Sequence, residues 1–196
     1  PNGGTVLDLG AGDGLTKGLF PSNWEWDGID IVPFPPDVKK GDAHKLDFED
    51  NSFDLVISIA VFEHLHSPWI AIKEISRVLK KGGFLLGTVA FLEPEHGNSY
   101  FHMTKRGMSK IIEEGNLVEQ YIEPVKGWRA PVSLKILPLP GIKFLSRFRS
   151  FIIFGLRSFL MNVRILTLKD DRKYRALSYK TEDKYRYSGS FRFLAK

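Results

Sequence analysis

Short apolar runs alternate with helix-like segments over residues 5–91, and this alternation leaves few folds open to the chain. Residues 53–59 form a strand-length run rich in apolar and β-branched side chains, as in strands that are buried on both faces. Residues 68–80 follow with Pro at the first helical position and with Ile, Val and Leu at near-helical spacing. Strands that alternate with helices form parallel sheets with right-handed crossovers, so the pattern predicts an α/β fold.

The other expected elements depend on shorter runs and on their flanking residues. We expect further strands at residues 5–9, 26–31, 37–40, 84–90, 117–125 and 189–195. The glycine pair at 82–83 is predicted to end the helix at 68–80, and another helix is expected directly after the glycines at 10–14. Thr104 has the character of an N-cap for a helix that ends near Glu114.

Residues 126–184 differ from the rest of the chain because they are basic, aromatic and almost free of acid until Asp170. We interpret them as an insertion before the last strand, so that residues 1–125 and 185–196 form the core domain. Within the insertion, residues 143–168 carry apolar and aromatic side chains at helical spacing, with Arg between them. This pattern favours a lid helix, and peripheral contact with an anionic membrane is the alternative.

The composition narrows the chemistry. The 196 residues suffice for one globular domain with an insertion. The chain has no cysteine, which excludes a disulfide framework, a thiolate zinc site, a cysteine nucleophile and a cysteine-held iron–sulfur cluster. Residues 1–100 carry 8 Lys and Arg against 15 Asp and Glu, whereas residues 101–196 carry 20 against 8. The basic half therefore either meets an anionic partner or presents a solvated face.

Glycine recurs at every second position over residues 10–14, directly after the first strand. Such a loop lets the backbone turn tightly and lets a ligand approach the main chain. A dinucleotide fingerprint would need glycine where the chain has Leu15, so a nicotinamide oxidoreductase is a weaker hypothesis. Asp30 follows Gly10 by 20 residues, the distance of acids that accept hydrogen bonds from ribose hydroxyls. Asp42, after the third strand, is placed to accept from an adenine amino group.

Five segments resemble the class I S-adenosylmethionine-dependent methyltransferases, and they occur in the order of that family: VLDLGAGDG, GIDIV, GDAHKLDFEDNSFDLVIS, FEHL and EISRVLKKGGFLLGTV. They are most similar to the small-molecule branch that includes the ubiquinone-pathway methyltransferases. The resemblance covers about residues 5–115. It implies a Rossmann-like three-layer sandwich with a mostly parallel seven-stranded sheet and an antiparallel last strand, here with a helical insertion before that strand. The family's helix before the first strand is expected to be absent or trimmed, because the chain begins at Pro1.

Matched position by position, the resemblance implies S-adenosylmethionine as cofactor and S-adenosylhomocysteine as product. It assigns these residues to the cofactor: Asp8, Gly10, Ala11, Gly12, Asp30, Ile31, Asp42, Ala43, Ile59 and Ala60. The residues at 8–12 would border the methionine part, and Asp30 would bind the ribose. Ile31 would pack on the adenine and the residues at 42–43 would contact its edge, while those at 59–60 would close the site near the sulfonium.

The methyl acceptor is expected beside the ends of the fourth and fifth strands. His64 and His102 are candidate catalytic bases, because the pKa of histidine lies near neutrality, and the alternative is a structural role in their loops. Glu63 and Tyr100 are candidate substrate contacts. No H-E-x-x-H or comparably compact ligand spacing occurs, so we expect no metal site.

These residues predict an enzyme that moves a methyl group from S-adenosylmethionine to a small-molecule or lipid-like acceptor by in-line displacement. The alternative is a catalytically silent cofactor-binding module that recruits a membrane or a partner. The first residues show no basic region followed by an apolar one, so we expect a cytoplasmic protein, peripheral to a membrane if residues 143–168 contact one. Nucleic acid is not an expected partner, because no recognised RNA-binding motif occurs.

Overall fold

The computed structural model describes residues 3–33, 36–93, 95–125 and 190–196. Contacts divide the chain into two compact units: Pro1–Phe91, Glu95–Glu123 and Phe191–Lys196 form the first, and Leu92–Pro94 and Pro124–Ser190 form the second. The insertion predicted at 126–184, with its lid or membrane helix at 143–168, lies outside the described residues. The domain boundaries expected from the sequence therefore stay a prediction.

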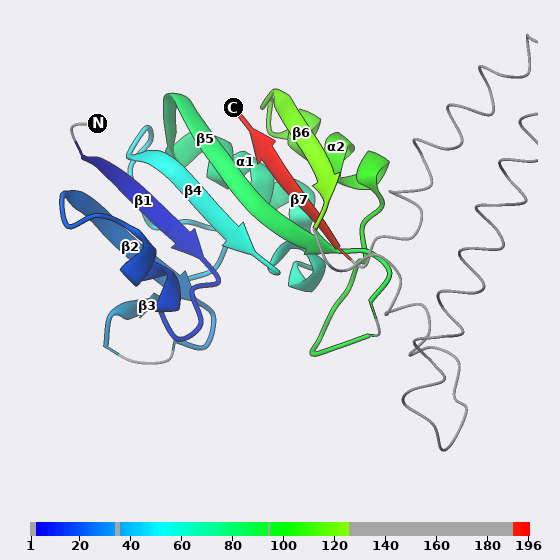
Figure 1. The fold of residues 1–196 in the computed structure, drawn as a ribbon, viewed down its shortest axis with the longest axis horizontal. Coiled ribbons are helices and arrows are strands. Elements are labelled where there is room, and N and C mark those ends of the chain that lie inside the picture. The colour runs from blue at the N-terminus through cyan, green and yellow to red at the C-terminus, as the bar shows by residue number, and fades with distance from the viewer. Residues whose placement is uncertain (1–2, 34–35, 94, 126–189) are drawn as a thin grey trace, which may run out of the picture. The chain divides into compact units, whose positions relative to one another are not determined.

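Seven strands form one sheet in the order β3-β2-β1-β4-β5-β7-β6 (Figure 1). Their bounds are β1 Gly4–Leu9, β2 Trp24–Asp30, β3 Val38–Lys40, β4 Phe53–Ile59, β5 Leu79–Ala90, β6 Glu119–Pro124 and β7 Ser190–Ala195. β1 pairs in parallel with β2 and with β4, β2 pairs in parallel with β3, and β4 pairs in parallel with β5. The predicted α/β class with a mostly parallel seven-stranded sheet is confirmed.

The last strand in the sequence runs antiparallel to its neighbour β6. Val118 and Lys196 exchange two main-chain hydrogen bonds of 2.7 and 3.0 Å, and the Val125 N–H donates to the Ser190 carbonyl at 3.1 Å. Residue numbers therefore rise along one strand while they fall along the other, which defines an antiparallel pair. Figure 1 shows β7, in red, between β5 and β6. The antiparallel last strand that the resemblance implied is confirmed.

Two helices, α1 Pro68–Val78 and α2 Lys105–Glu114, contact each other and lie behind the sheet in the view of Figure 1. α2 begins as predicted, because the Thr104 hydroxyl accepts a hydrogen bond from the Gly107 N–H at 3.0 Å. The chain passes close to α1 where α2 ends. A Cβ added at Gly115 would stand 2.7 Å from Ile72 Cγ1, so a larger residue would push the two helices apart.

The predicted end of the first helix at Lys80 is wrong, because α1 ends at Val78 and the chain enters β5 at once. Leu79 already has the extended angles φ −69° and ψ 134°. The last carbonyls of α1 accept hydrogen bonds from another loop: the Asn51 N–H donates to Arg77 at 3.0 Å, and the Ser52 N–H donates to Val78 at 2.8 Å. A distant segment thus caps this helix, so the glycine pair at 82–83 is not its stop signal.

The helix predicted after the glycine loop is also wrong, because the chain forms only the 3-10 helix η1 Leu15–Leu19 there. Gly14 precedes η1 with a left-handed φ of 74°, and Gly18 lies within it. Glycine disfavours helix, and Pro21 follows two residues after η1. The connection from β1 to β2 is therefore short and compact.

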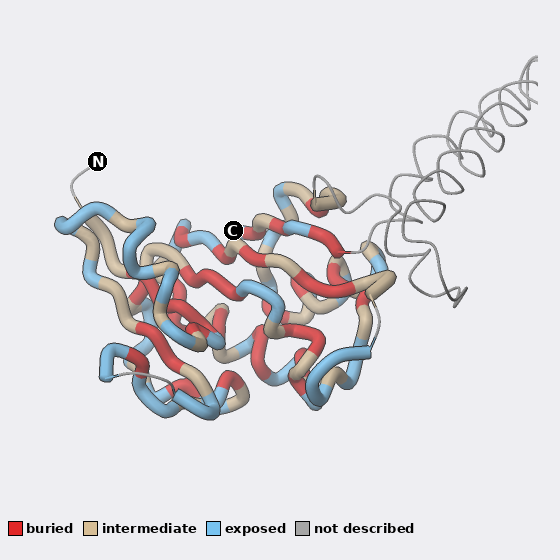
Figure 2. The backbone as a smooth tube through the Cα atoms, turned by 60° about the horizontal axis from the view of Figure 1, so that its bottom comes forward, coloured by how far each residue is buried: buried red, intermediate tan, exposed pale blue. Residues whose placement is uncertain are grey.

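Buried residues concentrate along the strands, whereas many exposed residues lie in the connecting loops (Figure 2). β5 shows the two-residue period of a strand. Leu85, Gly87 and Val89 are buried, while Phe84, directly before Leu85, is 37% exposed. Phe62 and Phe193 meet edge to face in the core, with ring centroids 5.8 Å apart. This contact packs the segment that follows β4 against β7.

Among the described residues, no helix is long and apolar enough to cross a membrane. The cytoplasmic location and the peripheral membrane contact both stay predictions.

Gly87 in β5 has no room for a side chain. A Cβ added there would stand 2.3 Å from the Ser58 carbonyl oxygen and 2.5 Å from Phe193 Cζ. We expect Gly87→Ala to lower the free energy of unfolding by about 1–3 kcal/mol, because a neighbouring strand and a buried ring must both shift. Urea denaturation of the two proteins measures this difference.

Gly18→Ala is the matched control, because no atom lies within 4 Å of a Cβ added at that position. We expect it to leave the free energy of unfolding unchanged or to raise it by up to about 1 kcal/mol, because alanine favours helix over glycine. A Gly87→Ala variant as stable as the unaltered chain would contradict the close packing of β7 on β5.

Candidate functional site

The glycine loop leaves β1 at the edge of the sheet where the carboxyl ends of the parallel strands meet. The N–H groups of Gly10 and Ala11 both donate to the Ile29 carbonyl oxygen at 2.9 Å, which fastens the loop to β2. Gly10 has a φ of 72°, and a Cβ added there would stand 2.4 Å from Val61 Cγ2. Only glycine accommodates both the left-handed backbone and this close approach.

Asp30, at the end of β2, binds the glycine loop through its carboxylate. Its Oδ2 accepts from the Gly12 N–H at 3.0 Å, and its Oδ1 accepts from the Val32 N–H at 2.9 Å. An ionised carboxylate has about four acceptor positions, so these bonds leave others for the hydroxyls of a ligand. No atom lies within 4 Å of a Cβ added at Gly12. A ligand can therefore approach the loop main chain beside a carboxylate that still accepts hydrogen bonds.

Asp8 is an acid buried inside β1. It is 2% exposed, and the Thr16 hydroxyl donates a hydrogen bond to its Oδ2. Burial raises the pKa of Asp8 because it penalises the charged form, and the hydrogen bond from Thr16 opposes that rise. The two effects leave a carboxyl group that is costly to ionise in the middle of the sheet.

A second acidic loop follows β3. Asp42 Oδ1 accepts from the His44 main-chain N–H at 2.9 Å and lies 2.7 Å from His44 Nδ1. The Ser67 N–H donates to His44 Nε2 at 3.3 Å, so the neutral ring carries its proton on Nδ1 and donates it to Asp42. The main-chain hydrogen bond from His44 is the first cause that lowers the pKa of Asp42. Ala43, which lies between Asp42 and His44 in the sequence, is nearly buried at 9% exposure.

A hollow of about 280 Å³ lies beside Asp42. Apolar Ile29, Leu46 and Phe48 line it together with Gly41, and the other lining residues are charged: Lys39, Lys40, Asp42, Lys45 and Asp47. An apolar wall next to a hydrogen-bond acceptor suits an aromatic ring that carries an amino group. Asp42 is the residue that this hollow shares with the set predicted to bind the cofactor.

Two of the predicted apolar contacts are open to a ligand. Ile31 follows β2 and is 67% exposed, and Ile59 ends β4 and is 48% exposed. Ala60 comes next with a φ of 54°, an uncommon conformation for a residue other than glycine. Its N–H donates to the carbonyl oxygen of Thr88 at 3.2 Å and to the Thr88 hydroxyl at 3.1 Å. β5 thereby holds the turn that leads away from β4.

The 3-10 helix η2 Phe62–His64 follows that turn, and the loop after β5 folds against it. The Glu63 carbonyl oxygen accepts from the N–H groups of Tyr100 and Phe101 at 2.7 and 3.1 Å. The Tyr100 side chain itself is 60% exposed. These bonds hold the loop after β5 against η2, so candidates from the two loops lie near each other, and their role at the acceptor stays a prediction.

Three histidines gather around this contact. The ring centroids of His64 and His96 are 5.3 Å apart, and those of His96 and His102 are 5.7 Å apart. Glu63 is 1% exposed, and burial raises its pKa. Glu63 Oε2 and His102 Nε2 are buried without a hydrogen-bond partner among the described residues. Such groups are rare in folded proteins, and a bound water, an ion, a ligand or a catalytic role accounts for them.

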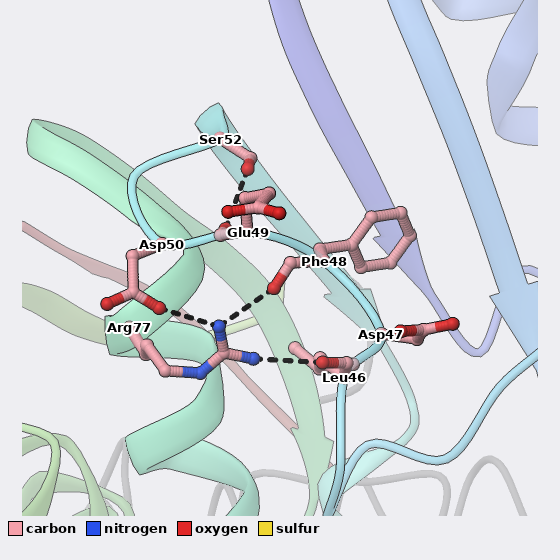
Figure 3. A pocket seen from close by; sticks show the side chains of 7 residues that line it. All are labelled: Leu46, Asp47, Phe48, Glu49, Asp50, Ser52 and Arg77. Carbon is pink, nitrogen blue, oxygen red and sulfur yellow. Dashed lines mark hydrogen bonds and ion pairs between the residues drawn. The ribbon is translucent and has the colours of Figure 1, made fainter.

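Sequence reasoning missed Arg77 in α1, which holds the loop after Asp42 in place (Figure 3). Arg77 donates to the carbonyl oxygens of Leu46 and Phe48 at 2.9 and 2.8 Å. It also pairs with Asp50 and Glu74, each at 2.8 Å. Glu74 and Arg77 are three residues apart on the same helix, but nothing local in the sequence shows that the guanidinium reaches a loop.

Sequence reasoning also missed Thr16 and His44 as members of the site, and it placed His96 in the loop after the fifth strand without assigning it a role. Each is a single polar residue in a loop or a short turn. Thr16 donates to Asp8, His44 accepts from the Ser67 N–H, and His96 lies beside His64. The only signal was that they follow strands of the predicted sheet, which is true of many loop residues. Their roles therefore needed the tertiary structure.

Residues 7–87 match a family model described as a methyltransferase domain. The chain is 36% identical over 101 residues to the 2-methyl-6-phytyl-1,4-hydroquinone methyltransferase of Synechocystis sp., covering 44% of this chain and 32% of that protein. It is 39% identical over 125 residues to the tRNA (carboxymethyluridine(34)-5-O)-methyltransferase of Arabidopsis thaliana, covering 58% and 30%. It is 30% identical over 97 residues to the phosphatidylethanolamine N-methyltransferase of Cereibacter sphaeroides, covering 41% and 48%. The alignments thus span less than half the length of these curated relatives.

Solved structures share the fold. The Haemonchus contortus phosphoethanolamine N-methyltransferase 2, in complex with S-adenosyl-L-methionine, has a TM-score of 0.56 at 20% identity, covering 99% of this chain and 48% of that one. The Burkholderia thailandensis 1,6-didemethyltoxoflavin-N1-methyltransferase, with bound 1,6-didemethyltoxoflavin and S-adenosylhomocysteine, has a TM-score of 0.55 at 18% identity, covering 63% and 64%. Identities this low show a common fold and leave substrates open.

The raised pKa of Asp8 makes the stability of the chain depend on pH. The folded state holds the Asp8 proton more tightly than the unfolded chain, where the pKa is about 4. Stability from this group is therefore full below pH 4 and is lost as the pH rises through the higher folded pKa. We expect Asp8→Asn, which stays neutral, to gain stability relative to the unaltered chain between pH 4 and pH 7, measured by urea denaturation at both values.

Thr16→Val is the contrasting variant, because it removes the hydrogen bond that favours the ionised Asp8. We expect it to be less stable than the unaltered chain at pH 7, with a smaller difference at pH 4. An Asp8→Asn variant that is less stable by the same amount at both pH values would show that ionisation of Asp8 carries no cost.

Proposed function

We propose that the chain is a class I S-adenosylmethionine-dependent methyltransferase, because residues 7–87 match a methyltransferase domain, and that it transfers a methyl group from S-adenosylmethionine to a small-molecule or lipid-like acceptor. S-Adenosylmethionine supplies an activated methyl group on a positively charged sulfonium and leaves as S-adenosylhomocysteine. The residues that would hold it are Asp8, Gly10, Ala11, Gly12, Asp30, Ile31, Asp42, Ala43, Ile59 and Ala60. They lie at the carboxyl ends of the parallel strands, where open α/β sheets bind ligands.

The hydrogen bond from the Gly12 N–H to Asp30 Oδ2, at 3.0 Å, carries this proposal. It joins a loop with room for a ligand to a carboxylate with acceptor positions to spare. A nucleoside ligand with vicinal hydroxyls fits that carboxylate, and the exposed Ile31 beside it offers an apolar surface for the base. The hydrogen bond also fixes both groups before the ligand arrives, which lowers the entropy cost of binding.

Methyl transfer from a sulfonium is an in-line displacement, so the main tasks of the protein are to align the acceptor and to exclude water. We propose that Glu63, His64, Tyr100 and His102 line the acceptor side, because they lie in the two loops that follow β4 and β5. His102 is the candidate base for a hydroxyl or amine acceptor. Its buried Nε2 without a partner supports this role, since a buried ring nitrogen gains a hydrogen bond when an acceptor proton faces it.

The relatives named for a hydroquinone and for phosphatidylethanolamine support a small or lipid-like acceptor. The relative named for a tRNA adds nucleic acid to the acceptors worth testing. Each alignment leaves more than half of the relative unmatched, so the names of the relatives do not identify the acceptor of this chain and screening is needed.

We expect the chain to bind one equivalent of S-adenosylmethionine and Asp30→Asn to weaken that binding roughly tenfold or more. The substitution keeps the shape of the side chain but removes the charge, and hydrogen bonds to charged groups contribute about 1.5–3 kcal/mol. Isothermal titration calorimetry measures the two dissociation constants.

Asp37→Asn is the matched control, because Asp37 is an exposed acid that pairs with Lys17 on the surface. We expect it to bind S-adenosylmethionine as the unaltered chain does. Equal binding by the Asp30→Asn variant would contradict the role of Asp30, and absence of binding by the unaltered chain would contradict the proposed function.

Production of S-adenosylhomocysteine across a panel of quinols, phospholipids, small amines and tRNA distinguishes an enzyme from a silent cofactor-binding module. With an acceptor found in this way, we expect His102→Ala to lower kcat by about 10²–10⁴-fold if His102 is the base, with unchanged affinity for S-adenosylmethionine. The surface variant Asp37→Asn is the control and should turn over as the unaltered chain does. If the His102→Ala variant turns over as fast as the unaltered chain at every pH, His102 is not the catalytic base.

A further inference from the structure

Glu63, His64 and His96 form a compact group of metal-ligating side chains at the carboxyl ends of β4 and β5. One ligand atom from each lies within 4.8 Å of the other two. We propose that these three residues bind a divalent first-row transition metal, with Zn²⁺ as the best match. The site is independent of whether the chain transfers methyl groups, because it depends only on these side chains.

Main-chain hydrogen bonds build the group from two loops. η2 presents Glu63 and His64 on adjacent residues, and the Glu63 carbonyl oxygen accepts from the Tyr100 and Phe101 N–H groups of the other loop. Gly97 lies so close to His64 that a Cβ added there would stand 3.4 Å from His64 Cε1. The loop after β5 therefore lies against the His64 ring. His96 directly precedes Gly97 in this loop, so the fold itself brings the three side chains together.

Glu63 provides the independent sign of a missing ligand. The residue is 1% exposed, and its Oε2 has no hydrogen-bond partner within the part of the chain that the structure describes. Buried carboxylates are normally paired with a cation or coordinate a metal, because an unpaired one loses its hydration without compensation. Main-chain hydrogen bonds from Glu63 and Ala90 act on this carboxyl, and the charged groups that act on it are His64 and His96. Oε2 is the atom left for a further ligand.

The kind of ligand selects the kind of metal. Two imidazole nitrogens and one carboxylate are the ligands of catalytic zinc sites, which keep a further position open. Mg²⁺ and Ca²⁺ prefer sets of oxygen ligands and would fit poorly. Four-coordinate zinc holds ligand atoms about 3.4 Å apart, so the three atoms need to move inward by about an ångström or less. His64 and His96 are only partly buried, so rotation of their side chains can supply this change.

A bound metal would change the roles of the histidines. A nitrogen that coordinates a metal has no free lone pair for a proton, so His64 could not serve as a base while it is a ligand. His102 would keep that role, since it is not one of the three ligands. The open position on the metal would be available to an oxygen or nitrogen of a small molecule, and that consequence alone rests on the proposed function.

The test is titration of chelator-treated protein with Zn²⁺ by calorimetry and with Co²⁺ by visible absorption. We expect one equivalent of Zn²⁺ to bind the unaltered chain and to raise its melting temperature. Co²⁺ should give the intense visible bands of a four-coordinate site. Glu63→Gln, His64→Ala and His96→Ala should each weaken Zn²⁺ binding at least about tenfold. His66→Ala, an exposed histidine outside the group, should bind as the unaltered chain does.

Each of the three variants is first compared with the unaltered chain by thermal denaturation without metal, so that a variant that does not fold is set aside and the others decide. If several Zn²⁺ ions bind weakly and the three substitutions leave that binding unchanged, the ions bind elsewhere on the surface and the proposed site is wrong. Equal loss in the His66→Ala variant would overturn it as well. Titration of S-adenosylmethionine into the chelated protein is the separate measurement that tests the proposed function.

Discussion

The burial of β1 between two parallel neighbours is the constraint on which the candidate site depends. Val6 and Leu7 are fully buried in this strand, and it pairs on one side with β2 and on the other with β4. Apolar burial therefore holds three strands in parallel with their carboxyl ends at one edge. The glycine loop, Asp30 and the turn after β4 meet there because the strands before them cannot slide without exposing the core.

Acidic groups at this edge organise the loops before any ligand is present. Asp30 accepts hydrogen bonds from two main-chain N–H groups, and Asp42 accepts from the main chain and the ring of His44. A carboxylate that is already fixed can meet ligand hydroxyls or amino groups without being ordered first. The same bonds give each acid a structural role, so loss of the acid affects the loop as well as the ligand.

The two sides of the site are built differently. The side proposed for the methyl donor depends on main-chain geometry, with Gly10 and Gly12 in left-handed conformations and little side-chain bulk. The other side depends on polar side chains from two loops, and its buried Glu63 lacks a partner for one oxygen. A glycine loop already shaped for a ligand, next to a buried carboxyl group with an unpaired oxygen, is expected where stability is lost in favour of binding or chemistry.

Hydrophobic periodicity and residue spacing in the sequence determined the α/β class, β4 from Phe53 to Ile59, and the acids that end β2 and follow β3. These inferences held because apolar burial sets the strands and because the carboxyl ends of parallel strands gather at one edge. Only the tertiary structure decided that Asn51 and Ser52 cap α1, that Arg77 reaches a loop, and that His96 joins Glu63 and His64. Each of those contacts joins segments far apart in the chain, and hydrogen bonds or ligand groups of that kind leave no periodic signal in either segment.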